Sequence, residues 1–578
     1  MSGFFLSVPS PDVRASVVQQ QENIRRAAFA KKGMRLTLTQ NANGYVLDLF
    51  ANRSHDPAQA LTRDASGRFC TYVGTLIYRG RANSEATAEI LKDIEGGQLD
   101  CLDAAIGNYC LLIGDERGLQ VVTDRAGLHH VYHTTDFSLV SNSFIATAGI
   151  LPQRTFQTQE ILEYVLLGST FGAKTMLHEI ELLDAENIIH VRDDSVRTIL
   201  RASVWTADAS RRETIPERLA QVLETADQYY SQLTRTYGDR VTAALSGGYD
   251  SRLSLAFLQR QYITPALFVY GADTDLDVQI AKSIGRGENL ELSHLDRGSR
   301  AIMGPEAYWQ NQQDVFHGLD GLTQYGFACE PYEVSHRRER VDGGQITVNG
   351  GGGEIWRDFW KLPDRPMSAE EFSRAYFSGR FDGLRSTISS PREFLSALGQ
   401  KIGEIAGVKS GRMSPSAVQS LYARLRLRFW QGKNNSVDNF FGYAVTPFSE
   451  HHFSVPAMWI PLKAKQNDWF ERQLIQRTSP NLARYPSSHG YSLEGGPNLF
   501  QIAKASITRG LPAWIRGRRR QQRIRHERSY YHSERFVHAR FGAPPLEVER
   551  YFQLSRLTDA LAFSRALTVE RMLRGDWL

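Results

Sequence analysis

The chain has 578 residues, more than a single hydrophobic core normally supports, so we expect at least two domains. Its 68 basic and 63 acidic side chains give a formal charge of +5, which is too small to indicate nucleic-acid binding. Four widely spaced cysteines argue against a disulfide scaffold or a zinc site, and no uncharged apolar run is long enough to span a bilayer, so we expect a cytoplasmic protein.

The first part of the chain, to about residue 200, has the pattern of a β-rich domain. Short apolar or alternating runs are separated by Gly, Asn and Asp, which is typical of strands joined by turns. Helical spacing interrupts these runs at residues 84–96. We expect strands within residues 35–40, 45–51, 68–78, 108–115, 118–124 and 130–142.

The pattern changes after about residue 216. Strands and helices then alternate, which predicts a parallel sheet with helices on its faces. Residues 368–578 are mostly helical in pattern, and periodicity is lost between residues 193 and 216, so we place domains at 1–205 and 215–578. The alternating elements are a helix at 217–237, a strand at 240–246, a helix at 250–261, a strand at 263–271 and a helix at 274–287.

The segment LSGGYDSRL, residues 245–253, joins one of these strands to the helix that follows it. This is the carboxyl end of a parallel sheet, the usual place for a ligand in open α/β folds. Backbone N–H groups and the positive end of the helix dipole favour an anion there. The small residues Ser246, Gly247, Gly248 and Ser251 let the backbone wrap such an anion, although the pattern is not GxxxxGK[ST].

An aspartate in this loop decides between two interpretations of the segment. Asp250 would repel a phosphate unless a divalent cation lay between them, so it is a candidate Mg²⁺ ligand. The alternative is a Gly-Ser turn capped by Asp or Ser. The pattern SGGxDS between a buried strand and a helix favours the metal and phosphate site.

The sequence SGGYDS resembles the SGGxDS pyrophosphate loop of the ATP pyrophosphatase superfamily, and nearly the whole chain resembles the asparagine synthetase family. Further blocks are similar to that family at residues 348–356 (VNGGGGEIW) and 445–453 (VTPFSEHHF). A DRxG block followed by a tyrosine matches at Asp124, Arg125, Gly127 and Tyr132.

This resemblance implies the fold and the cofactors. The expected fold is an N-terminal Ntn-hydrolase-like αββα sandwich followed by a doubly wound parallel α/β ATP-pyrophosphatase domain with a helical C-terminal part. The cofactors would be ATP and Mg²⁺, with Asp250 and Glu354 as metal ligands and Glu354 also a candidate base near an acyl-adenylate. Asp358 either shares that duty or caps a helix expected at residues 355–360. The nucleotide-binding residues so implied are Leu245, Ser246, Gly247, Gly248, Asp250, Ser251, Val269, Gly271, Asp277, Gly350 and Gly351.

Three departures from the family pattern bear on function. Ser2 stands where the family has its glutaminase cysteine, and VGTLIY at residues 73–78 replaces the glutamine-binding NGE segment, so we expect the first domain not to hydrolyse glutamine. The family also has a late lysine that steadies the departing phosphate, and PNLARYPSSHGYSLEGG has none. His489, Ser487, Ser488 and Tyr491 are the polar candidates there, and His489 joins Glu354 in our list of catalytic residues.

Two functions remain open on these residues. The first is an ATP-dependent amide ligase like β-lactam synthetases and lasso-peptide macrocyclases, which would act on a carboxylate substrate, including a precursor peptide that meets a processing protease. The second is an amidotransferase that acts on a metabolite or a surface sugar with ammonia or glutamine. The intact SGGYDS argues against a non-catalytic scaffold. The basic run at residues 509–526 is either a solvated face or a dock for an acidic partner, and we expect no nucleic-acid partner.

Overall fold

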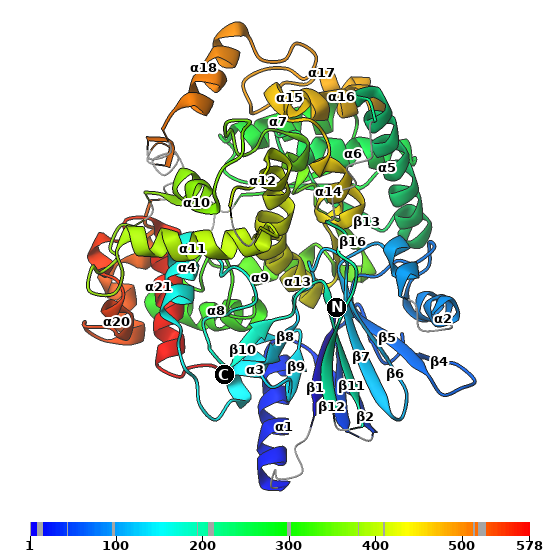
Figure 1. Ribbon diagram of the computed structural model, residues 1–578, viewed down its shortest axis with the longest axis vertical. Coiled ribbons are helices and arrows are strands. Elements are labelled where there is room, and N and C mark those ends of the chain that lie inside the picture. The colour runs from blue at the N-terminus through cyan, green and yellow to red at the C-terminus, as the bar shows by residue number, and fades with distance from the viewer. Residues whose placement is uncertain are drawn as a thin grey trace.

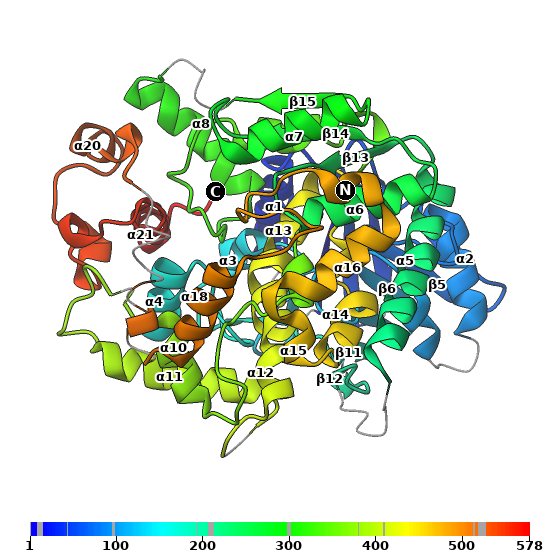
Figure 2. The same ribbon diagram turned by 90° about the horizontal axis from the view of Figure 1, so that it is seen from above.

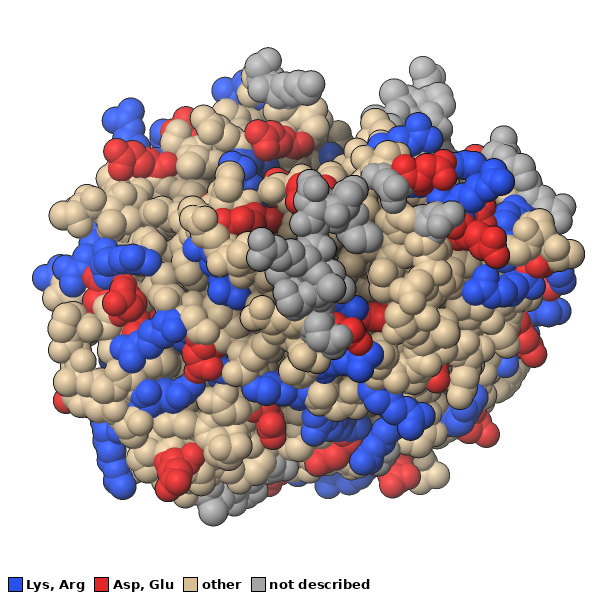
Figure 3. Space-filling view, turned by 90° about the horizontal axis from the view of Figure 1, so that it is seen from below, with Lys and Arg blue, Asp and Glu red and all other residues tan. Residues whose placement is uncertain are grey.

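The computed structural model shows an antiparallel sandwich at the lower right of Figure 1 and a larger α/β and helical body above and to the left of it. The structure describes residues 2–8, 15–42, 44–94, 99–193, 195–205, 213–296, 302–379, 381–408, 411–512, 515–517, 519 and 527–578. Among the helices of these residues, none is both long and apolar enough to cross a membrane. On the face seen from below, basic and acidic side chains of the described residues are intermixed (Figure 3).

Two six-stranded antiparallel sheets form the N-terminal part. In spatial order, the first contains β10 (Ile180–Leu182), β8 (Tyr132–Thr134), β9 (Leu139–Ser141), β1 (Gly3–Ser7), β3 (Tyr45–Ala51) and β2 (Arg35–Ala42). The second contains β12 (Ser195–Leu200), β11 (Asn187–Arg192), β7 (Gly118–Thr123), β6 (Tyr109–Gly114), β5 (Phe69–Gly74) and β4 (Thr62–Arg63). Alternate apolar side chains of the two sheets, such as Phe4 and Leu49 against Leu112 and Val121, fill the space between them.

Helices cover both outer faces of this sandwich. The helices α1 (Ala15–Ala30) and α3 (Phe144–Ile150) pack on the first sheet, where Phe29 of α1 stacks on Phe50 of β3. The helix α2 (Asn83–Asp93) packs on the second sheet. The predicted αββα sandwich is therefore confirmed, although α1 and α3 were not among the expected elements.

The parallel sheet that was predicted after residue 216 has five strands. Its order is β15 (Leu292–Leu295), β14 (Ala266–Tyr270), β13 (Val241–Ala244), β16 (Ile346–Val348) and β17 (Tyr443–Val445), and every neighbouring pair is parallel. From β13 the chain builds outward on one side to β14 and β15, then returns to place β16 on the other side. The strand order reverses between β13 and β16, and this switch point is where open α/β sheets form a ligand crevice.

Helices pack on the parallel sheet, as expected for a doubly wound fold. The helix α6 (Asp250–Arg260) contacts β13, α7 (Leu276–Gly287) contacts β14 and β15, and α5 (Ile215–Tyr237) packs on α6. After α9 (Glu333–Glu339), the Arg340 carbonyl oxygen accepts a hydrogen bond from Thr242 Oγ1 of β13 at 3.2 Å.

The rest of the chain is helical, as predicted. A π-helical segment, Tyr422–Gln431, joins α12 (Pro415–Leu421) to α13 (Gly432–Phe441). The helix α4 (Thr158–Leu167), from the N-terminal part, packs against α21 (Ala560–Leu573), so the two parts share one apolar core. The remaining helices are α8 (Pro305–Gly318), α10 (Ala369–Phe377), α11 (Pro391–Ile405), α12 (Pro415–Leu421), α13 (Gly432–Phe441), α14 (His451–Met458), α15 (Leu462–Lys465), α16 (Trp469–Thr478), α17 (Pro480–Arg484), α18 (Leu499–Gly510), α20 (Glu534–Phe541) and α21 (Ala560–Leu573).

Buried charges also join the two parts. The Asp320 carboxylate, fully buried after α8, lies 3.1 Å from Lys32 Nζ and 3.1 Å from Lys433 Nζ. It also accepts a hydrogen bond from Ser143 Oγ at 2.6 Å, at the start of α3. A buried charge is tolerated only when it is paired and hydrogen-bonded, so these contacts depend on one another.

A buried glutamate provides a further link between the two parts. Glu450, at the start of α14, accepts hydrogen bonds from the Gly107 N–H at 2.8 Å and from Tyr229 Oη at 2.6 Å. Burial raises the pKa of Glu450 to about 8. The folded protein therefore holds a proton at Glu450 that the unfolded chain releases at a lower pH.

We expect this proton to make stability fall with rising pH. Because the pKa of Glu450 is raised in the folded state, its contribution to the free energy of unfolding is complete below the ordinary carboxyl pKa. This contribution is lost as the pH rises through about 8. The slope is at most about 1.4 kcal/mol per pH unit. In Glu450→Gln the melting temperature should depend less on pH between pH 6 and 9, as measured by calorimetry. The control Glu288→Gln removes a half-buried carboxylate that accepts from Tyr485 Oη at 3.0 Å, and it should keep the wild-type dependence.

Candidate functional site

Two glycine-rich loops meet at the switch point of the parallel sheet. One follows β13 and carries SGGYDS, and the other follows β16 and carries NGGGGE. A Cβ atom at Gly350 would lie 2.5 Å from Ser251 Cα, and one at Gly353 would lie 2.7 Å from Asp250 Cγ. Only glycine permits this close approach, so the second loop packs directly against the first.

Serine hydroxyls hold the first loop in shape. Ser251 Oγ accepts the Ser246 N–H at 3.0 Å, and Ser246 Oγ accepts the Gly248 N–H at 3.2 Å. The loop also binds the late polar segment, because the Ser488 N–H donates to the Gly247 carbonyl oxygen at 3.0 Å. The buried Arg252 guanidinium adds a bond to the Pro486 carbonyl oxygen at 2.7 Å. These bonds place His489 beside the SGGYDS loop.

Carboxylates from three segments surround one arginine. The Arg357 guanidinium donates to Asp250 Oδ1 at 2.6 Å and lies 3.0 Å from Glu471 Oε2, on α16. Glu354 Oε1 lies 3.9 Å from the same guanidinium, and Glu354 Oε2 accepts a hydrogen bond from Tyr422 Oη at 2.6 Å. The Arg357 guanidinium thus faces three buried or half-buried carboxyl groups.

The three carboxyl groups differ in their proton affinity. Burial raises the pKa of Asp250 well above its usual range and that of Glu471 to about 7. Burial also acts to raise the pKa of Glu354, but Arg357 and the Tyr422 hydroxyl outweigh it and lower that pKa to about 2. Glu354 therefore carries the charge, while Asp250 and Glu471 compete for a proton that a bound cation would displace.

His489 stands at the edge of this cluster. Its Nδ1 lies 3.3 Å from Asp468 Oδ2, and its Nε2 lies 3.2 Å from Arg357 Nη1. Because a guanidinium only donates, Nε2 is the accepting nitrogen and Nδ1 carries the proton toward Asp468. The imidazole also stacks on the Tyr249 ring, with 4.2 Å between centroids.

Most of the predicted nucleotide-binding residues lie at this crevice. A Cβ atom at Gly247 would lie 2.7 Å from Asp277 Oδ1, which places the predicted acidic residue beside the loop. Val269 and Gly271 lie at the carboxyl end of β14, and Gly271 has a φ of +138°. The side chains of Leu245 and Val269 are buried in the core, so only their backbone groups could face a ligand.

Two expectations from the sequence change in the structure. The helix expected at residues 355–360 is wrong, because a short 3-10 turn ends at Trp356 and residues 357–360 are not helical. Asp358 consequently caps no helix there. Its carboxylate pairs with Arg509, at the end of α18, with 2.8 Å between Oδ2 and Nε.

Four residues of this site were not found from the sequence: Arg357, Tyr422, Asp468 and Glu471. Arg357 follows Glu354 by three positions, and this basic residue beside the acidic loop was the one available signal. The other three lie far along the chain from both loops, on elements whose packing brings them to the site.

The donor set suits a magnesium ion that is shared with phosphates. Among the described residues, no group of three or more His, Cys, Asp or Glu side chains has the arrangement of a metal site. Asp250 and Glu354 are two carboxylates near one guanidinium. Mg²⁺ commonly takes one or two carboxylates, with phosphate oxygens and waters as its other ligands, so these residues fit it.

Ser2 lies at the start of β1, far along the chain from the two loops. Ser2 is 1% exposed. Its carbonyl oxygen accepts a hydrogen bond from Asn142 Nδ2 at 3.2 Å, and its hydroxyl has no hydrogen-bond partner among the described residues.

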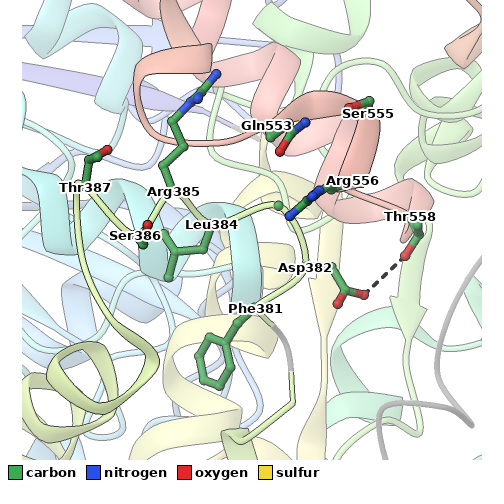
Figure 4. Close-up of a pocket in the computed structure, with 11 residues that line it drawn as sticks. Phe381, Asp382, Leu384, Arg385, Ser386, Thr387, Gln553, Ser555, Arg556 and Thr558 are labelled. Carbon is green, nitrogen blue, oxygen red and sulfur yellow. Dashed lines mark hydrogen bonds between the residues drawn. The ribbon is translucent and has the colours of Figure 1, made fainter.

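Two cavities differ in their relation to the site. One, of about 630 Å³, opens from Glu354, Arg357 and His489 toward α18. The other, of about 750 Å³, lies between residues 381–387 and 553–558, where Thr558 Oγ1 donates to Asp382 Oδ2 at 3.2 Å (Figure 4). None of the predicted site residues lines the second cavity.

The basic run lies largely outside the described residues. Residues 513–514, 518 and 520–526 are among those not described. Arg509 binds Asp358, and Arg516 Nη1 donates to the Lys361 carbonyl oxygen at 2.6 Å. Arg519 is exposed.

Comparison with known proteins gives one sequence relative. No family model matches the chain. A 7-cyano-7-deazaguanine synthase of Staphylococcus haemolyticus (strain JCSC1435) is 28% identical over 86 residues, which are 14% of this chain and 39% of that protein. The chain thus spans about two-fifths of the length of the curated relative it matches.

Two solved structures were also matched, both weakly. A glutamine phosphoribosylpyrophosphate amidotransferase from B. subtilis, complexed with ADP and GMP, has 10% identity and a TM-score of 0.23 over 65% of this chain and 77% of that chain. An allosteric regulatory enzyme of purine biosynthesis has 12% identity and a TM-score of 0.22 over 60% of this chain and 74% of that chain. At these TM-scores neither structure bears on the reaction of this chain.

Proposed function

We propose that the protein is an ATP-dependent ligase, similar to the asparagine synthetase family, that adenylylates a carboxylate and passes the acyl group to an amine. The observation that carries this proposal is the meeting of the SGGYDS and NGGGGE loops at the switch point, with Asp250 and Glu354 beside one guanidinium. The 28% identical synthase gives support for a synthetic reaction. The proposed division is a sandwich domain at 1–205 and a ligase domain at 215–578.

In the first step the substrate carboxylate attacks the α-phosphorus of ATP, which forms an acyl-adenylate and releases pyrophosphate. Backbone N–H groups of the SGGYDS loop and the N-terminus of α6 bind the departing pyrophosphate. Asp250 and Glu354 would hold Mg²⁺, which neutralises phosphate charge when it is bound. The Arg357 guanidinium supplies a fixed positive charge at the same place, in a chain that lacks the family lysine.

In the second step an amine attacks the acyl carbon and AMP leaves. The amine must lose a proton, and His489 is a candidate acceptor if its Nε2 exchanges the hydrogen bond from Arg357 for one from the amine, while Asp468 holds its Nδ1–H. Glu354 is the second candidate base. A finer version has the amine on the same molecule, as in macrolactam formation on a lasso precursor peptide, and the alternative is an amidotransferase that uses ammonia or glutamine.

ATP–pyrophosphate exchange tests this proposal without knowledge of the amine. A set of carboxylic acids is screened with Mg·ATP and labelled pyrophosphate, and the acid that is adenylylated gives labelled ATP. With that acid and an amine, ATP should yield AMP and pyrophosphate. Formation of ADP and phosphate would reject the adenylylating ligase. So would a broad set of acids of which none supports exchange.

The mass of the product separates the two versions. An internal amine gives a product lighter than the substrate by one water, whereas ammonia replaces a hydroxyl by an amino group and lowers the mass by about one unit. Reactions with and without ammonium distinguish these outcomes by mass spectrometry.

The sandwich domain is not expected to take part in the chemistry. The purified protein should release little glutamate from glutamine, and Ser2→Ala should leave pyrophosphate exchange unchanged, because the buried Ser2 replaces the thiol and the NGE segment is missing. Glutamate release is measured with glutamate dehydrogenase. Glutamine turnover that disappears in Ser2→Ala would make Ser2 an N-terminal nucleophile instead.

A further inference from the structure

The helix α18 presents an apolar stripe to the cavity beside the site. Its cavity-lining positions include Phe500, Ala503, Lys504 and Ile507, which recur at the spacing of one helix face. Phe500 is 74% exposed and Ile507 is 65% exposed, so this apolar stripe is not packed against the protein. Figure 1 shows α18 at the upper left, standing off from the main body above α10.

Aromatic side chains form the opposite wall of this cavity. Phe359 and Trp360 lie 5.0 Å apart between ring centroids, and Tyr376 of α10 lies 4.5 Å from Trp360. Trp360 is 3% exposed, so its ring is a fixed part of this wall.

The cavity is continuous with the cluster of carboxylates and arginine. Glu354, Arg357 and His489 line its inner end, where the acyl carbon would react. Lys504 stands within the apolar stripe and forms no ion pair with another described residue. At about 630 Å³ the cavity has the size of a small-molecule site.

We propose that this cavity binds the acyl donor, and that the donor is an amphiphilic carboxylic acid whose apolar body lies between α18 and the Phe359–Trp360–Tyr376 wall. The adenylylation of the carboxylate rests on the proposed function. The apolar character of the rest of the acid is inferred from the residues that line the cavity. The carboxylate reaches the Arg357 end, and the apolar body covers Phe500 and Ile507. A ten-carbon acid should bind at least about tenfold more tightly than a four-carbon acid, because more apolar surface leaves water.

Calorimetric binding of butyrate and decanoate, without ATP, tests the cavity. Decanoate should bind at least about tenfold more tightly than butyrate. Phe500→Ser and Ile507→Ser should each weaken decanoate binding by about tenfold or more, because each removes one large apolar contact. Leu499→Ser is the matched control, since Leu499 is 85% exposed on the same helix and does not line the cavity. All three residues are exposed, so the variants should fold.

Pyrophosphate exchange with the same acids tests the reaction. Exchange that rises with chain length and falls in Phe500→Ser and Ile507→Ser supports both proposals. Binding with this pattern but without exchange supports the cavity and rejects the ligase. Equal affinity for the two acids, or an equal loss in Leu499→Ser, overturns the assignment of the cavity. Exchange that occurs with a peptide but with neither acid would show that the acyl donor belongs to another class. This result would also overturn the assignment of the cavity.

Discussion

Replacement of Asp250 by asparagine is expected to remove most of the Mg·ATP-dependent release of pyrophosphate and to leave the fold intact. Asparagine has the size of aspartate and can still accept a hydrogen bond from Arg357, so the loop should keep its shape. It lacks the negative charge that a bridging Mg²⁺ requires. Loss of one fixed electrostatic contact at a reacting phosphate should lower the rate by about 100-fold or more.

Two measurements separate binding from catalysis in Asp250→Asn. Affinity for Mg·α,β-methylene-ATP is measured by calorimetry, and pyrophosphate release is measured by a coupled assay with the adenylylated acid. Asp227→Asn is the control, because Asp227 pairs with Arg260 at the other end of α6, with 2.6 Å between Oδ1 and Nε on the surface. A rate equal to that of the wild type in Asp250→Asn would reject the assignment of the pyrophosphate loop.

Replacement of Arg357 by glutamine should have a second large effect, on both activity and stability. Arg357 is the cation between Asp250, Glu354 and Glu471, and without it these buried carboxyl groups face one another. Loss of one partner from a buried ion pair typically costs about 3–5 kcal/mol. We therefore expect a clear drop in the melting temperature, together with loss of pyrophosphate exchange.

Two further variants show whether charge or shape matters at this position. Arg357→Lys restores the charge without the planar fork, so stability should recover in part and activity less. Arg365→Gln removes an exposed arginine that pairs with Glu371, and because solvent screens such a pair, this variant should change the melting temperature little. A melting temperature in Arg357→Gln that equals that of Arg365→Gln would show that Arg357 does not hold the carboxylates together.

The residues of the SGGYDS loop could be singled out from the sequence because their pattern is local. A buried strand, a small-residue turn and a helix follow one another within residues 241–260, and strand and helix patterns are visible in a single chain. The second loop was found for the same reason, since its glycines directly follow a short apolar strand. Here the structure adds the physical cause, which is that Gly350 and Gly353 touch Ser251 and Asp250.

The electrostatics of the site could not be predicted in the same way. Asp250 looked like a free metal ligand in the sequence, but in the structure its carboxylate is bound by Arg357 and lies beside Glu471. Glu471 is more than 200 positions away from Asp250, on a helix whose apolar spacing gives no sign of a buried carboxylate. Likewise, nothing in the local sequence links Tyr422 to Glu354.

By itself, the sequence determined a β-rich first part, the alternating strands and helices of a parallel sheet, and the two loops that bear on chemistry, while the αββα arrangement was implied by the resemblance to the asparagine synthetase family. These features depend on periodicity and on glycine and serine at turns, which act over a few residues. The tertiary structure alone decided which charges share the site, that His489 accepts a hydrogen bond from Arg357, and that α18 faces a cavity. Burial and pKa depend on which distant segments pack together, and that information is not contained in any short stretch of the chain.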